Sequence, residues 1–145
     1  MPRLLEKNLI QRVLRRLPRD IHSQSMTFGS QSFGGTPDRY FDGTRRDCWI
    51  EFKQLKTTPR SGIAVGDFSD LQLIWLERRH RIGANAFGFV GLADGRVSIQ
   101  VTPEQWRQGS PLSEAVSIEE AAKWIVDFCG SQFEPSVSSS RRSRA

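Results

Sequence analysis

Apolar residues recur every three or four positions in three parts of the chain, which predicts three main helices. The first pattern covers residues 4–17 and ends at Pro18, because proline cannot continue a helix. The second covers residues 69–83 and closes with a glycine suited to a helix C-terminus. The third begins at a capping box, residues 117–120, and ends near Gly130.

Apolar and alternating runs between these helices predict strands. Two pairs of strands surround turn sequences with a glycine, Gly43 and Gly95, as in β-hairpins. A short helical turn is expected to begin at Thr102-Pro103-Glu104. The expected strands are residues 26–28, 39–41, 48–53, 86–92 and 96–101, and the longer loops are residues 29–35 and 57–66.

The elements follow one another in the order helix, three strands, helix, two strands, helix. This alternation predicts an α/β (α+β) protein with a mixed central β-sheet flanked by helices. A length of 145 residues suits one domain, which we place at residues 1–130. Residues 131–145 have no periodicity and end in Ser-Ser-Ser-Arg-Arg-Ser-Arg-Ala, so we expect a flexible basic tail there.

The strand at residues 48–53 carries charge in its middle. Side chains alternate along a strand, so Ile50 and Phe52 face one side while Glu51 and Lys53 share the other. Burying an unpaired polar group costs about 2–7 kcal/mol, and a charge costs more, unless something compensates. A divalent metal is such a compensator, and Asp38, on the neighbouring hairpin arm, supplies a second carboxylate. The alternative is a surface strand with an ordinary cross-strand ion pair.

Charge and composition narrow the choice of partner and of metal ligand. Lys and Arg outnumber Asp and Glu by 21 to 16, and most of the cations are arginines, which suit phosphate recognition. Many proteins of this charge bind no nucleic acid, so the excess alone is a weak indication. Cys48 and Cys129 are far apart and lie in apolar runs, as reduced core residues do, which leaves oxygen ligands for any metal. With no membrane-length apolar run and no secretory signal, we expect a cytoplasmic protein.

The set Asp38, Glu51 and Lys53, together with the element order, resembles the PD-(D/E)XK nuclease superfamily. It is similar to archaeal-type Holliday-junction resolvases and to the stand-alone VRR-type nucleases often carried by phages. The resemblance implies a restriction-endonuclease-like core of order αβββαββα and a Mg²⁺-dependent (or Mn²⁺-dependent) endonuclease that cuts DNA, with branched DNA as a candidate substrate. It also implies a homodimer. Asp38, Glu51 and the Phe52 carbonyl would hold the metal, and Lys53 would orient or help to deprotonate the attacking water.

The same resemblance assigns four further residues to the site. Glu6 matches a glutamate on the first helix that approaches the metal, although an acid there also complements the helix dipole. Gln72 matches a glutamine early in the second helix, although it also completes a capping box with Ser69. Ser30 and Ser32 lie where archaeal resolvases have a mobile loop with a functional serine, and a plain surface loop is the alternative.

Several basic residues flank the expected site in sequence and would form the positive rim that DNA requires. Each of them is, taken singly, an ordinary solvated charge. A different class of function also fits: a non-catalytic nuclease fold that binds DNA or serves in phage structure or assembly, in a virion or in the host cytoplasm. An RNA-directed nuclease is a third candidate. The expected DNA contacts are Arg45, Arg46, Lys56, Arg60, Arg78, Arg79 and Arg81.

Overall fold

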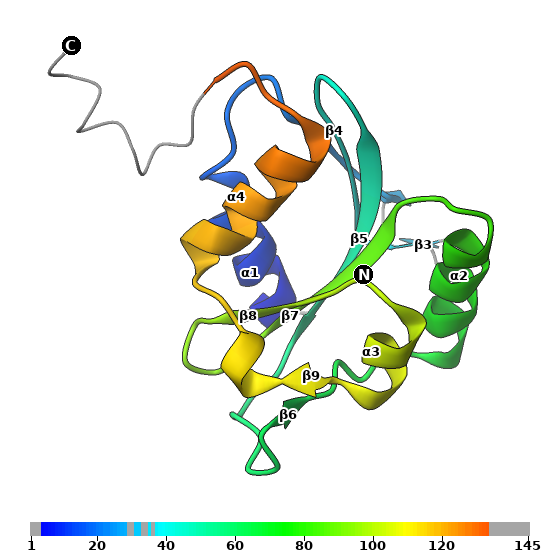
Figure 1. The fold of residues 1–145 in the computed structure, drawn as a ribbon, viewed down its shortest axis with the longest axis vertical. Coiled ribbons are helices and arrows are strands. Elements are labelled where there is room, and N and C mark those ends of the chain that lie inside the picture. The colour runs from blue at the N-terminus through cyan, green and yellow to red at the C-terminus, as the bar shows by residue number, and fades with distance from the viewer. Residues whose placement is uncertain (1–3, 29–30, 33–34, 36, 134–145) are drawn as a thin grey trace, which may run out of the picture.

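The computed structural model describes residues 4–28, 31–32, 35 and 37–133 of the chain. Its centre is a five-stranded mixed sheet with the strand order β1-β4-β5-β7-β8, and helices lie on both faces of it (Figure 1). Only the β5–β7 pair is parallel. This arrangement confirms the predicted mixed sheet flanked by helices. The strands are β1 (His22–Ser25), β4 (Arg39–Asp42), β5 (Asp47–Gln54), β7 (Ala86–Gly91) and β8 (Val97–Gln100).

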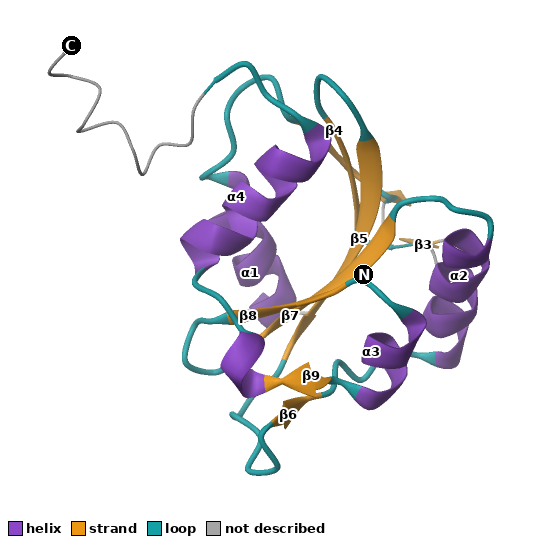
Figure 2. Ribbon diagram, viewed as in Figure 1, coloured by secondary structure: helices purple, strands orange, loops and turns teal. Residues whose placement is uncertain are grey.

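Two pairs of helices enclose the sheet, as Figure 2 shows in purple. Three of the four start with a complete capping box, in which Ser69, Thr102 or Ser117 accepts a hydrogen bond from the backbone three residues later. None of the helices in the described part of the chain is long and apolar enough to span a membrane. The helices α1 (Leu4–Leu14) and α4 (Ile118–Cys129) cover one face, and α2 (Asp70–Arg81) and α3 (Pro103–Gln108) cover the other.

Each face of the sheet has its own hydrophobic core. Ile50, Phe52 and Phe89 pack under α1 and α4, while Val90 and Ala86 pack under α2 and α3. Because side chains alternate along β5, the burial of Ile50 and Phe52 on the first face directs the charged residues between and after them to the α2 face. Because Ile50 and Phe52 belong to the core under α1 and α4, Glu51 and Lys53 lie on the opposite face, beneath α2.

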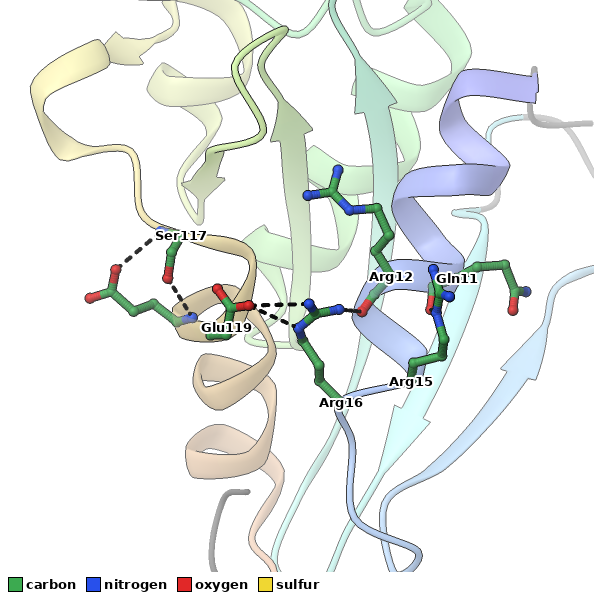
Figure 3. Close-up of polar contacts among 7 residues, drawn as sticks. Gln11, Arg12, Arg15, Arg16, Ser117 and Glu119 are labelled. Carbon is green, nitrogen blue, oxygen red and sulfur yellow. Dashed lines mark hydrogen bonds and ion pairs between the residues drawn. The ribbon is translucent and has the colours of Figure 1, made fainter. Parts of the chain in front are cut away.

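An ion pair joins the segment that follows α1 to α4, and the C-terminus of α4 is joined to the β4–β5 turn. Arg16 donates from Nη2 to Glu119 Oε2 at 3.1 Å and from Nη1 to the Arg12 carbonyl at 2.7 Å (Figure 3). At the other end of α4, the backbone N–H of Thr44 donates to the Gly130 carbonyl at 2.8 Å. The bond from Thr44 fixes the β4–β5 hairpin relative to α4, and the Arg16 bonds connect α4 to the segment after α1.

The position of the first strand is wrong in the sequence prediction. The strand that joins the main sheet is β1, and residues 27–28 belong to β2 (Thr27–Phe28), which pairs with β3 (Gln31–Ser32) in a separate ribbon. A polar edge strand such as His22-Ser23-Gln24-Ser25 lacks the apolar alternation by which strands are recognised. The predicted loop at 57–66 also contains β6 (Ile63–Ala64), which pairs with β9 (Ser110–Pro111); two residues are too few for a period. A single 3₁₀ turn, Leu112–Glu114, follows β9.

Candidate active site

The strand β4 pairs only with the first half of β5, and Asp38 lies directly before the first paired residue of β4. The paired part of β4 begins at Arg39. Just before it, Oδ2 of Asp38 accepts a hydrogen bond of 3.0 Å from the backbone N–H of Phe52, so the carboxylate replaces a ladder acceptor. If the β4–β5 register continued for two more residues, Pro37 would lie opposite Phe52. Proline has no N–H to donate to the Phe52 carbonyl. At the N-terminal end of β4, the carboxylate of Asp38 and the carbonyl of Phe52 are therefore left on the same side of β5.

Gly35 holds the segment before Asp38 against α2. Its φ is +79°, and a Cβ at this position would lie 2.2 Å from the carbonyl oxygen of Leu71. Glycine tolerates both the left-handed backbone and the close approach. The contact brings the chain that carries Asp38 to the first turn of α2, where Gln72 lies.

Glu51 is the centre of the site. Only 2% of its surface is exposed. Its Oε2 accepts a hydrogen bond of 2.8 Å from Gln72 Nε2 and lies 3.8 Å from Lys53 Nζ. Its Oε1 has no hydrogen-bond partner among the residues that the structure describes. Leaving a buried carboxylate oxygen without a donor is unfavourable, so this oxygen requires a proton or a cation.

The carboxyls of Asp38 and Glu51 interact directly and compete for protons. Burial raises the pKa of Glu51 well above its ordinary value, and the charge of Asp38 raises it further. Burial also raises the pKa of Asp38, although the Phe52 N–H bond acts in the opposite direction. The ammonium of Lys53 lowers both pKa values but does not outweigh burial. The pair is therefore poised to hold either an extra proton or a positive ion.

These features fit a hard divalent cation such as Mg²⁺ or Mn²⁺. Such ions bind carboxylate and carbonyl oxygens, and one of them would remove the repulsion between the two carboxylates and supply a partner for Glu51 Oε1. Asp38 and Glu51 would hold the ion, and the Phe52 carbonyl is the nearby backbone candidate. Within the described residues, no group of three or more His, Cys, Asp or Glu side chains is placed to hold a metal. Water would therefore complete the ligand shell, as is usual for Mg²⁺.

Glu6 approaches this region from α1. It is buried, and its charge raises the pKa of both Asp38 and Glu51, so the structure brings it near the pair. It does not form a three-carboxyl group with them, and its role as a metal ligand stays a prediction. Glu6 also lines a pocket of about 210 Å³ together with Lys53, Gln54, Leu55, Lys56, Gly66 and Asp67.

Asp67 is the site residue that the sequence did not indicate. It lies in the loop before α2, is exposed, and has a φ of +54°, which is uncommon for a residue other than glycine. The Gly66-Asp67 pair is an ordinary turn sequence, and nothing in its spacing places it beside Lys53. Only the path of the loop from β6 to α2 brings the two residues to one pocket.

Gln72 combines the two roles that the sequence left open. Its backbone N–H and its Oε1 complete the capping box with Ser69, at 3.2 and 2.9 Å, while its Nε2 reaches Glu51. The α2 cap is thus part of the site, because one amide joins the first turn of the helix to the buried carboxylate. A helix cap of this kind contributes about 1 kcal/mol to stability.

Gln72→Ala should therefore destabilise the protein and also impair the site. We expect a loss of about 1 kcal/mol in unfolding free energy. If Glu51 holds a metal ion, we also expect a loss of about tenfold or more in divalent-metal affinity or cleavage rate, because Glu51 loses its hydrogen-bond donor. Glu120→Ala is the matched control, since it removes the same half of the capping box at α4, far from the site. Equal effects of the two substitutions on metal affinity would show that Gln72 acts only as a cap. Urea unfolding and calorimetric Mn²⁺ titration measure the two effects.

The structure gives Arg45 and Arg46 partners away from the carboxylates. Arg45 Nη2 donates to the Asp127 carbonyl at 2.6 Å, and Arg46 Nε donates to the Phe128 carbonyl at 2.8 Å. The guanidinium of Arg46 also stacks 4.3 Å from the ring centroid of Phe128. Both side chains satisfy carbonyls at the C-terminus of α4, so sequence proximity to the motif was a poor guide to their place. Contact of either with DNA stays a prediction.

The other expected DNA contacts fall in different places. Lys56 lines the same pocket as Lys53 and Glu6. Arg78 and Arg79 lie on the outer side of α2, and Arg60 is exposed in the loop between β5 and β6. Arg81 is also exposed, near Glu77. Ser30 lies outside the described residues, and for Ser32 the structure describes the backbone alone.

A solved Holliday junction resolvase is similar in structure. This protein is Hjc from the archaeal hyperthermophile Archaeoglobus fulgidus, and it matches with 17% sequence identity and a TM-score of 0.49. The match covers 83% of this chain and 97% of Hjc. No model of a known protein family matches the sequence, and no curated protein matches it. A resemblance this distant assigns no activity to the chain.

Proposed function

We propose that this chain is a divalent-metal-dependent endonuclease that hydrolyses phosphodiester bonds in DNA. The observation that carries the proposal is the interaction between the half-buried carboxyl of Asp38 and the buried carboxyl of Glu51. In it, Glu51 Oε1 has no hydrogen-bond partner within the described residues, and the Lys53 ammonium lies 3.8 Å from Oε2. A structural ion pair does not need a second acid. A buried and a half-buried carboxylate beside one lysine instead suit a site that takes up a cation.

The charges of the site admit a phosphate once the cation is bound. Asp38, Glu51 and Lys53 carry one net negative charge when both acids are ionised, and the nearby Glu6 adds a second. A divalent ion brings this total to zero. The ion supplies Lewis-acid chemistry: it lowers the pKa of a bound water and neutralises charge that develops on the phosphate. A phosphate would then no longer be repelled by an excess of negative charge.

Lys53 is the protein side chain that would act on the attacking water or on the phosphate. It is largely buried, with 18% of its side chain exposed, and Glu51 fixes its position. From there the ammonium can donate a hydrogen bond to a water, orienting it for attack, or to a phosphate oxygen that gains charge in the transition state. Lys56 lines the same pocket and would contact the phosphate backbone further along the strand.

The motif's similarity to archaeal-type resolvases makes branched DNA the first substrate to test, and a homodimer in the cytoplasm is part of the proposal. We expect purified protein to cleave a labelled four-way junction faster than a linear duplex or a flap in Mg²⁺, and to cleave none of them in EDTA. Cleavage that continues in EDTA, or no cleavage of any of the three with Mg²⁺ or Mn²⁺, would contradict the proposal. Salt-sensitive DNA binding without turnover would instead favour the non-catalytic alternative, and a preference for RNA would favour an RNA-directed nuclease.

A further inference from the structure

The two cysteines of the chain meet in the core that packs under α1 and α4. Cys48 lies in β5, and Cys129, 81 positions later, is the last residue of α4. Both are free thiols with no exposed surface, and their Sγ atoms lie 3.9 Å apart. A disulfide bond needs about 2.05 Å between the sulfurs, so rotation of the two side chains has to close a gap of about 2 Å.

The backbone holds the two thiols in place. The carbonyl of Cys129 accepts hydrogen bonds from the backbone N–H groups of Arg45 and Arg46, at 2.8 and 3.0 Å. These two residues form the end of the β4–β5 turn, directly before the strand that carries Cys48. Gly43 permits the close approach, since a Cβ there would lie 2.8 Å from the Cys129 carbonyl oxygen. The end of α4 therefore lies beside the start of β5 (Figure 1), and the contact between the sulfurs follows from this arrangement.

The two thiols differ in reactivity. A hydrogen bond from Cys48 lowers the pKa of Cys129, and the charge of Arg46 acts in the same direction, although burial opposes both. The same hydrogen bond and burial raise the pKa of Cys48. Because the thiolate is the reactive form of cysteine, Cys129 is the nucleophile of the pair and Cys48 is the thiol that resolves its oxidised form.

We propose that Cys48 and Cys129 are a site of reversible oxidation, at which a peroxide joins β5 to α4 through an intramolecular disulfide bond. The Cys129 thiolate attacks one oxygen of hydrogen peroxide, the O–O bond breaks, and the departing hydroxide takes up the proton that Cys129 released. Sγ of Cys48 then attacks the resulting sulfenic acid: the S–S bond forms, the S–O bond breaks, and the oxygen leaves as water with the proton of Cys48. In total, two thiols are oxidised and one peroxide is reduced to two waters.

Access of the oxidant sets the rate of this reaction. Both sulfurs are buried, so the peroxide reaches them only when the surrounding structure opens. Cys129 is the final residue of α4, and helix ends open more readily than helix interiors. We therefore expect oxidation to be slower than that of an exposed thiol, and reduction by a dithiol to depend on the same opening.

The disulfide bond would stabilise the fold without entering the candidate active site. It closes a loop that contains α2, β7, β8 and α3, and closing a long loop restricts the unfolded chain strongly. Cys48 shares one face of β5 with Ile50 and Phe52, whereas Glu51 points to the other face. The oxidation site is therefore independent of the proposed function, and no cleavage assay is needed to test it.

Thiol counting on the full chain tests the site. Wild-type protein is treated with hydrogen peroxide, the oxidant is removed, and free thiols are titrated after unfolding. We expect the count to fall from two per chain to none and dithiothreitol to restore both, while non-reducing electrophoresis shows single chains throughout. The melting temperature of the oxidised protein should rise by about 5–10 °C and return to its starting value on reduction.

Two variants give the control. Cys48→Ala and Cys129→Ala each keep one thiol, so peroxide should not raise their melting temperature. If either variant fails to fold, the reduced wild type is the control, because reduction restores the starting protein. Two free thiols after prolonged treatment, lost thiols that dithiothreitol does not restore, or chains linked to one another by disulfides would each overturn the proposal. An intramolecular disulfide that leaves the melting temperature unchanged or lowers it would overturn the stabilising role.

Discussion

Lys53→Ala should lower the rate of phosphodiester cleavage about 10²–10⁴-fold, the range over which a positioned proton donor or acceptor contributes. The substitution removes the ammonium that lies 3.8 Å from Glu51 but keeps both carboxylates and the Phe52 carbonyl. Affinity for Mn²⁺ should therefore stay close to that of the wild type or rise slightly, because a competing positive charge is gone. Single-turnover cleavage and calorimetric titration measure the two quantities on the same preparation.

Lys56→Ala is the matched control for this substitution. Lys56 lines the same pocket, is exposed, and has no contact with Glu51 among the described residues. Its loss should raise KM and reduce the salt dependence of binding, with little change in kcat. If both variants lose only affinity for DNA, Lys53 is a phosphate contact and not part of the chemistry. A Lys53→Ala variant that cleaves at the wild-type rate would contradict the assigned role.

Glu51→Gln should make the metal-free protein more stable at neutral pH. The folded-state pKa of Glu51 is raised by burial and by Asp38, so the protonated form is favoured in the folded protein. Its stabilising contribution is present below the ordinary pKa of a glutamate and is lost as the pH rises through the raised value. Glutamine imitates the protonated acid at every pH. We expect a gain of about 1–3 kcal/mol in EDTA at neutral pH, which is the cost of leaving a buried polar group unsatisfied.

Divalent metal should reverse this order of stability. Mg²⁺ or Mn²⁺ binds the ionised pair and stabilises the wild type by mass action, whereas Glu51→Gln lacks one carboxylate and should gain little. Thermal unfolding with EDTA and with Mn²⁺, over a series of pH values, measures both effects. Glu77→Gln is the control of opposite sign, because Arg107 lowers the pKa of Glu77 and its loss should cost stability at neutral pH. A Glu51→Gln variant that is destabilised in EDTA as Glu77→Gln is would contradict this account of the pair.

The central strand and its charged face could be predicted from the sequence because they depend on local periodicity. Alternation along β5 fixes the side to which Glu51 and Lys53 point, and the capping box at Ser69 fixes where α2 begins. The meeting of Asp38 with Glu51 was expected from the hairpin, whose register the structure now gives. In each case a pattern within one helix, one strand or one hairpin determined where the side chain lies.

What could not be predicted depends on contacts between distant segments. Arg45 and Arg46 bind carbonyls at the end of α4, about 80 residues further on, and no local pattern indicates this. The strand β1 is polar because it forms an edge of the sheet, so its sequence resembles a loop. Asp67 reaches the site through the course of a loop. Periodicity carries information on secondary structure, and these positions are set by tertiary packing.

An anomalous difference map from crystals of the wild-type protein grown with Mn²⁺ tests directly whether Asp38 and Glu51 bind a metal ion. We expect a peak between the carboxylates of Asp38 and Glu51, at about 2.0–2.6 Å from an oxygen of each, with Glu51 Oε1 as one of the ligands. The same map from Glu51→Gln crystals should lack the peak. Ordered carboxylates with no peak between them, or a Mn²⁺ ion bound elsewhere while the pair keeps a shared proton, would contradict the assignment of Asp38 and Glu51 as a metal site.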